Sequence, residues 1–121
     1  MIEREKFLIT GFSGFVSKHF LDYLENNKIY AEVLGVDVNE IIPFDYLNFT
    51  FVNCSFKKID LLDKQAVEEI INDFKPQFVL HLASYSSVAM SWKMPVESFT
   101  NNTNIFLNLI ETIRLSNLSC R

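Results

Sequence analysis

The sequence predicts an α/β fold, a three-layer sandwich in which helices cover both faces of a parallel sheet. Short apolar runs typical of buried strands alternate with longer stretches that place apolar residues every three or four positions. A glycine-containing turn joins the first such run to the first amphipathic stretch. The 121 residues are 49% hydrophobic and include only three glycines and three prolines, a composition that supports one packed domain.

The first half of the chain contains two expected strands and one expected helix. Residues 6–10 are an apolar run stopped by a glycine, which indicates a strand buried on both faces. Residues 14–27 indicate a helix, because apolar side chains recur at three-and-four spacing with charged ones opposite. Residues 30–37 return to strand character. Residues 41–54, broken by a proline, are expected to form a loop with a short turn of helix.

The second half contains two further strands and two helices. We expect a strand over 56–60 and a helix over 63–74, with Asp63 as its N-cap. Residues 77–84 are the clearest buried strand. A long helix over 95–114 begins with a proline, which suits a first helical turn.

The order of these elements is that of a sandwich built from right-handed crossovers. Four strands are half of a doubly wound sheet, and only a few residues follow the last helix. We therefore expect residues 1–121 to be the N-terminal part of a longer domain that lacks its second half and any substrate lobe.

Charge and composition exclude several classes of function. A net charge of −4 is spread along the chain, so we expect no binding to nucleic acid or to an anionic membrane. No apolar run reaches the roughly 18–20 residues of a membrane span, and the charged N-terminus is unlike a signal peptide. The two cysteines, Cys54 and Cys120, form neither a disulfide framework nor a metal motif. We expect a cytoplasmic protein with reduced thiols and no metal.

The first turn has the features of a diphosphate-binding loop. Gly11 follows the first strand and Gly14 opens the helix. Gly11 permits a tight turn, and Gly14 lets the backbone approach phosphates at the positive end of the helix. The third small position of such a loop is filled by Ser17. Two glycines alone are a weak signal, and the alternative is a tight turn that binds nothing.

An acidic residue at the end of the second strand strengthens this interpretation. Asp37 lies 23 residues after Gly14, near the interval of about 20 at which an acid binds a ribose diol. A carboxylate there would accept hydrogen bonds from both hydroxyls and repel a 2′-phosphate, which favours NAD over NADP. The alternative is an acid that merely ends a strand.

The end of the fourth strand is the other candidate ligand-facing segment. Small residues there are followed by a hydroxyl-rich loop, which suits a cofactor passing closely with a polar substrate beyond it. His81 lies within an apolar run, and we interpret it as a hydrogen-bonded core histidine rather than a base.

Together these motifs resemble the extended short-chain dehydrogenases/reductases of the NAD-dependent epimerase/dehydratase family. The stretch from His81 to Pro95 is most similar to GDP-mannose 4,6-dehydratases and GDP-4-keto-6-deoxymannose reductases. The matching pieces span the chain in order: Thr10-Gly-x-x-Gly14, Gly35-Val-Asp37, Asp60-Leu-Leu-Asp63, residues 75–83, Ser87-Val88, Ser91-Trp92, Pro95, Asn102 and Asn108-Leu-Ile-Glu111.

The resemblance implies a Rossmann-type sheet of strand order 3-2-1-4, an NAD cofactor and a nucleotide-sugar substrate. It assigns the pyrophosphate to the first turn, the adenosine ribose to the end of the second strand, the adenine to the end of the third, and the nicotinamide path to the end of the fourth. The residues so assigned are, in that order, Gly11, Phe12, Ser13, Gly14, Phe15 and Val16; Asp37 and Val38; Asp60 and Leu61; Leu82, Ala83 and Ser84. Substrate-side positions are Ser86, Ser87 and Asn102, although Asn102 could equally be an ordinary member of its polar run.

The resemblance is incomplete in two respects. Ser17, Ile105 and Phe106 replace smaller family residues, which puts close helix packing in doubt. The family's catalytic Tyr-x-x-x-Lys does not occur in these 121 residues, so we expect the chain itself to be inactive, with no catalytic residue of its own. An open apolar edge at 78–82 and the long helix predict a homodimer or an edge-strand or domain-swapped association.

Two alternatives remain at this point. One is a non-catalytic NAD(P)-binding sensor of the same fold. The other is an S-adenosylmethionine-dependent methyltransferase, which also uses a glycine-rich first turn and an acid after the second strand; the motifs Thr-Gly-x-x-Gly and His-Leu-Ala match that class poorly.

Overall fold

The structure is a computed structural model that describes residues 3–83 and 92–121. Four strands and three helices follow one another along the described chain. In order they are β1 (Glu5–Thr10), α1 (Phe15–Asn26), β2 (Ala31–Asp37), β3 (Val52–Lys58), α2 (Lys64–Phe74), β4 (Phe78–His81) and α4 (Pro95–Ser116).

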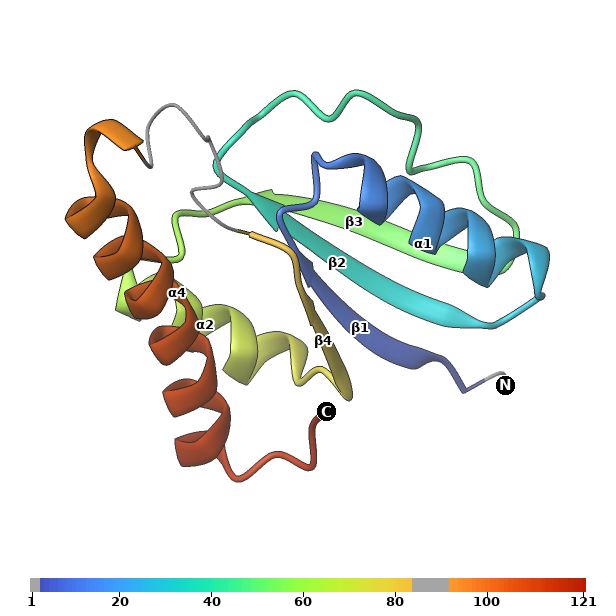
Figure 1. The fold of residues 1–121 in the computed structure, drawn as a ribbon. Helices are drawn as coiled ribbons and strands as arrows, with labels where there is room; N and C mark the ends of the chain where they lie inside the picture. Colours follow the sequence, from blue (N-terminus) through green and yellow to red (C-terminus); the bar gives the residue numbers. More distant parts are fainter. Residues whose placement is uncertain (1–2, 84–91) are drawn as a thin grey trace.

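All four strands are parallel and lie in the order β3-β2-β1-β4, which confirms the predicted topology. Figure 1 shows α1 on one face of the sheet and α2 with α4 on the other. The three-layer prediction is therefore confirmed. Parallel strands place all their carboxyl ends at one edge, so the turns after β1, β2, β3 and β4 meet there.

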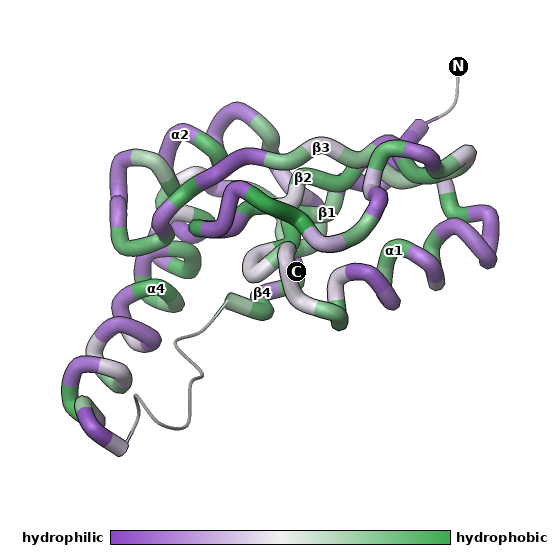
Figure 2. The backbone as a smooth tube through the Cα atoms, turned by 90° about the horizontal axis from the view of Figure 1, so that it is seen from above, coloured by the Kyte–Doolittle hydropathy of each residue, from purple (hydrophilic) through white to green (hydrophobic). Residues whose placement is uncertain are grey.

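Two hydrophobic cores hold the layers together, one on each face of the sheet. The core under α1 is built around Phe7, Ile9, Phe12, Leu21 and Val33. The core under α2 and α4 contains, among others, Leu8, Val36, Ile59, Leu61, Val67, Ile71, Ile105 and Leu109. Figure 2 shows hydrophilic and hydrophobic residues recurring by turns along α1 and α4, as expected for helices with one face on a core.

Several element boundaries differ from the prediction, and the largest differences are at the start of β3 and the end of β4. β3 begins at Val52, inside the region predicted as loop, because buried Val52 and Cys54 alternate with exposed Asn53 and Ser55. This is the period-two pattern of a half-buried edge strand, and the polar residues within it obscured the signal. β4 ends at His81, before the predicted end, and α4 runs two residues further, to Ser116.

The edge of β4 is not fully open, contrary to the prediction. The N–H of Arg121 donates to the carbonyl of Gln77 (2.9 Å), and the N–H of Val79 donates to the carbonyl of Arg121 (2.6 Å). Arg121 thus bonds, through its N–H and its carbonyl, to residues on either side of Phe78, which is the hydrogen-bond pattern of parallel strands. The long helix has carried the chain back to the start of β4, as Figure 1 shows, and part of the edge is thereby covered.

No helix within the described part of the chain is both long enough and apolar enough to cross a membrane.

Candidate functional site

A pocket of about 330 Å³ opens at the carboxyl ends of the strands. Its walls come from the turn after β1, the end of β2, the segments after β3 and β4, and the buried side of α4. The lining residues are Gly11, Ser13, Val36, Asp37, Val38, Asn39, Ile59, Asp60, Leu61, Leu82, Ala83 and Ile105. This is the position at which open α/β sheets bind ligands, where β1 has β2 on one side and β4 on the other.

The turn after β1 depends on glycine at its first position. Gly11 has φ +65°, and a Cβ there would lie 2.8 Å from both the nitrogen of Ala83 and the carbonyl carbon of Leu82. A side chain would therefore meet both a left-handed backbone and the chain leaving β4. The first turn and the chain that leaves β4 are therefore in close contact, and both line the pocket.

Helix α1 begins at this turn, and no side chain caps the N–H groups at its start. Gly14 is the N-cap and makes no side-chain cap, and the first turn of α1 contains no acidic residue. The N–H of Gly14 donates to the carbonyl of Gly11 (3.1 Å), which closes the turn. A helix start of this kind presents N–H groups and partial positive charge to an anion.

The carboxylate of Asp37 turns toward this mouth. Its Oδ2 accepts hydrogen bonds from the N–H (2.8 Å) and the hydroxyl (2.7 Å) of Ser13, and its Oδ1 accepts from the N–H of Asn39 (3.0 Å). Partial burial acts to raise the pKa of Asp37, but the hydrogen bonds from Asn39 and Ser13 outweigh it and hold the pKa below its ordinary value. The group is therefore ionised at neutral pH and fixed in direction.

A buried hydroxyl fixes the opposite wall. Thr10 Oγ1 accepts hydrogen bonds from the N–H groups of Leu82 (3.0 Å) and Ala83 (3.1 Å), and lies 2.6 Å from Nδ1 of His81. Because both acceptor positions of the hydroxyl are used, its proton is donated to Nδ1, and the neutral ring carries its proton on Nε2. Burial lowers the pKa of His81, which favours this neutral form. His81 is thus hydrogen-bonded, as predicted, but it is half-buried and not part of either core.

The wall after β3 is held by α4. The side-chain amide of Asn108 donates to the carbonyls of Leu61 (2.8 Å) and Leu62 (3.4 Å). Asp60 is exposed at the rim, where its Oδ1 accepts from the N–H of Leu62 (3.0 Å). Asp60 thus lies between the buried residues Ile59 and Leu61. This arrangement can bind a flat ring, with apolar contacts to its face and hydrogen bonds to its polar edge.

The structure brings together eight of the predicted cofactor residues and leaves others aside. The eight that line the pocket are Gly11, Ser13, Asp37, Val38, Asp60, Leu61, Leu82 and Ala83. Gly14, Phe15 and Val16 are not among the lining residues, and the side chains of Phe15 and Val16 face solvent. Asn102 is half-buried on α4 and does not line the pocket either. Ser84, Ser86 and Ser87 lie outside the described residues.

Phe12 has a different place from the one predicted. Its side chain is fully buried, with ring centroids 5.3 Å from Phe44, 5.6 Å from Tyr46 and 6.0 Å from Phe56. Its N–H donates to the carbonyl of Val36 (3.2 Å). Phe12 therefore anchors the turn from beneath, with its backbone donor already engaged.

Four lining residues were not predicted, namely Val36, Asn39, Ile59 and Ile105. Val36 and Ile59 directly precede predicted acids and Asn39 lies two positions after Asp37, which is the only local signal they carry. Ile105 was expected to disturb helix packing, yet it is buried in the core under α4 and closes one side of the pocket. The neighbouring Phe106 is half-exposed and faces the ring of His81.

Comparison with known proteins gives a consistent family. A sequence model described as the NAD dependent epimerase/dehydratase family matches residues 7–120. A probable dTDP-glucose 4,6-dehydratase from Sinorhizobium fredii is 32% identical, over 94% of this chain and 33% of that protein. The bifunctional protein GAL10 of Pachysolen tannophilus is 30% identical, over 92% of this chain and 16% of that protein.

Solved structures agree. The UDP-glucose 4-epimerase of Thermus thermophilus, in complex with NAD, is 32% identical with a TM-score of 0.72, over 93% of this chain and 35% of that one. The UDP-glucose 4-epimerase of Thermotoga maritima, with UDP-glucose, has a TM-score of 0.74 at 28% identity, over 93% and 35%. The chain thus spans about a third or less of the length of these relatives. Three of the four names refer to UDP- or dTDP-glucose, and the finer likeness to GDP-mannose enzymes stays a prediction.

Proposed function

The chain belongs to the NAD dependent epimerase/dehydratase family, and on that premise we propose that its pocket binds NAD(H), in preference to NADP(H), within an enzyme that acts on a nucleotide sugar. Bound NAD would supply a hydride acceptor for a carbon of the sugar. The residues present here would bind and orient that cofactor.

The single observation that carries the proposal is the carboxylate of Asp37. It is held by two donors of Ser13 at the mouth of the Gly11–Gly14 turn and is ionised at neutral pH. Such a carboxylate can accept hydrogen bonds from both hydroxyls of a ribose, whereas its negative charge would repel a 2′-phosphate. The opening of α1 beside it suits a pyrophosphate.

The other walls suit the remaining parts of the cofactor. Asp60 and Leu61 would meet the adenine, with the carboxylate accepting from its amino group. Leu82 and Ala83, fixed by the hydroxyl of Thr10, would line the path toward the nicotinamide. No Tyr-x-x-x-Lys occurs in these 121 residues, so we assign them cofactor binding and no proton transfer.

Isothermal titration calorimetry with NAD, NADP and S-adenosylmethionine tests the proposal. We expect NAD to bind most tightly. Asp37→Asn should weaken NAD binding by about tenfold or more, since hydrogen bonds to a charged group contribute roughly 1.5–3 kcal/mol.

Asp45→Asn is the matched control. Asp45 is an exposed carboxylate that accepts from the N–H two residues on, as Asp37 does, but it does not line the pocket. The control should bind NAD like the unaltered chain. Preferential binding of S-adenosylmethionine, or equal losses in the two variants, would contradict the proposal.

A further inference from the structure

A second carboxylate stands next to the ribose side of the pocket. A smaller hollow of about 320 Å³ adjoins the first, and its lining includes Glu40, Ile41 and Lys58. Val38 and Asn39 line both hollows, so the two adjoin one another. Whatever occupies the ribose position beside Asp37 therefore has the second hollow directly next to it.

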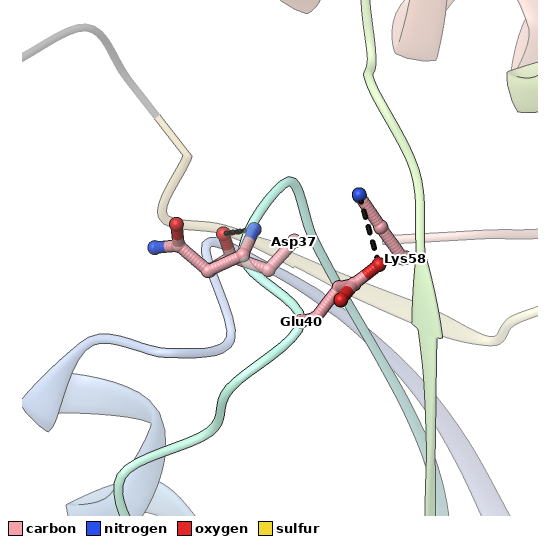
Figure 3. Close-up of polar contacts among 4 residues, drawn as sticks. Asp37, Glu40 and Lys58 are labelled. Carbon is pink, nitrogen blue, oxygen red and sulfur yellow. Dashed lines mark hydrogen bonds and ion pairs between the residues drawn. The ribbon is translucent and has the colours of Figure 1, made fainter.

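The only cationic side chain among the described lining residues of the two hollows is Lys58. Lys58 is the register partner of Asp37 where β2 and β3 pair, so its backbone lies at the ribose side of the site. Its Nζ, however, is 3.1 Å from Oε1 of Glu40. Figure 3 shows Glu40 and Lys58 facing one another beside Asp37.

This ion pair has a consequence for the choice of cofactor. The 2′-phosphate that distinguishes NADP from NAD carries a charge of about −1.5 to −2 at neutral pH and needs a cationic partner. Lys58 is the one cation among the described residues that line the two hollows, and Glu40 already pairs with it. Asp37 and Glu40 also place two carboxylates near the single ammonium group of Lys58, so the local net charge is negative.

Resting on the proposed cofactor role of the pocket, we propose that Glu40 is a specificity-determining residue that excludes NADP by holding Lys58. Asp37 repels the 2′-phosphate directly, and Glu40 withholds the cation that would otherwise neutralise it. The two residues therefore disfavour NADP in different ways, one by repulsion and the other by engaging the cation. Replacing Asp37 alone should not produce an NADP-binding protein.

Calorimetry on the Glu40→Gln variant tests this inference. The ligands are NAD and NADP, with 5′-AMP and 2′,5′-ADP as a pair that differs only in the 2′-phosphate. Freeing Lys58 should lower the Kd ratio of NADP to NAD by about three- to tenfold, the size expected for an exposed charge interaction, with NAD itself changed less than about twofold. The ratio of 2′,5′-ADP to 5′-AMP should fall equally. Adding Lys58→Met to Glu40→Gln should remove the gain.

Glu111→Gln is the matched control. It also removes one negative charge and frees a cation, because Glu111 pairs with Arg114 on α4, away from both hollows. Its NADP to NAD ratio should stay unchanged. If Glu40→Gln leaves the ratio unaltered, or shifts it no more than Glu111→Gln does, the role of Glu40 is wrong while NAD binding stands. If the unaltered chain binds neither dinucleotide, the proposed function itself fails.

Discussion

At the scale of single residues, the site depends on polar groups that the fold satisfies completely. Thr10 is fully buried, and its one hydroxyl serves two backbone donors and one ring nitrogen. A buried hydroxyl with this many partners fixes the segment after β4, which forms one wall of the pocket. Asp37 is fixed in the same manner from the other side, by Ser13 and Asn39.

Thr10→Val should destabilise the protein by about 1–3 kcal/mol, because it keeps the shape but leaves the N–H of Ala83 and Nδ1 of His81 unsatisfied. Urea unfolding measures the loss. The same variant should raise the pKa of His81, since the hydrogen bond it removes favours the neutral ring, and NMR titration of the ring reads this out. Thr10→Ser retains the hydroxyl and should leave that pKa near its original position. Equal pKa values in the two variants would show that the hydroxyl does not hold the ring.

At the scale of secondary-structure elements, β2 and the first turn lock together through an aromatic ring. A Cβ on Gly35 would lie 2.2 Å from the ring of Phe12, which is itself enclosed by rings from the long segment before β3 and from β3. Gly35 therefore creates the space in which Phe12 anchors the turn. The start of the segment between β2 and β3 lines the site, whereas Phe44 and Tyr46 further along it support the turn from beneath.

Gly35→Ala should lower stability by about 1–3 kcal/mol, because Phe12 has no room to move away from the added methyl group. Gly14→Ala is the comparison: its φ is an ordinary −77°, and its Cβ would lie 3.3 Å from the carbonyl oxygen of Gly11. That variant should lose less than about 1 kcal/mol. Thermal unfolding followed by circular dichroism distinguishes them, and a Gly35→Ala protein as stable as the original would refute the locked contact.

At the scale of the whole molecule, one face of α4 packs on the sheet and another carries a row of apolar side chains in solvent. Val96, Phe99, Phe106 and Ile110 recur at helical spacing, and each is about half exposed or more. Burying such a row removes apolar surface from water, which favours association with a second copy. This surface is a stronger basis for the predicted self-association than the edge of β4, which Arg121 partly covers.

Phe99→Glu should weaken self-association, measured as concentration dependence in sedimentation velocity. Leu115→Glu places the same charge on an exposed apolar position of the same helix, outside the row, and should have little effect. A chain that stays monomeric at high concentration would contradict the prediction.

The sequence predicted most of the architecture because its signals are local. Helical spacing, apolar strands, the Gly11–Gly14 turn and the interval to Asp37 are properties of neighbouring positions. These features sufficed for the three layers and for Gly11 and Asp37, whereas the strand order and most of the eight pocket residues were implied by the family resemblance. The start of β3 was missed because an edge strand buries only alternate residues, which dilutes its apolar signal.

Side-chain direction and long-range pairing were decided only by the tertiary structure. Nothing near Phe12 in the sequence indicates that its ring is buried, since the rings around it come from residues 44, 46 and 56. The partners of Thr10 lie more than 70 positions away, and Glu40, in the segment after β2, meets Lys58 at the end of β3. A sequence determines which faces must be buried, because that depends on periodicity; which groups then meet depends on how the buried faces pack, and only the folded chain settles it.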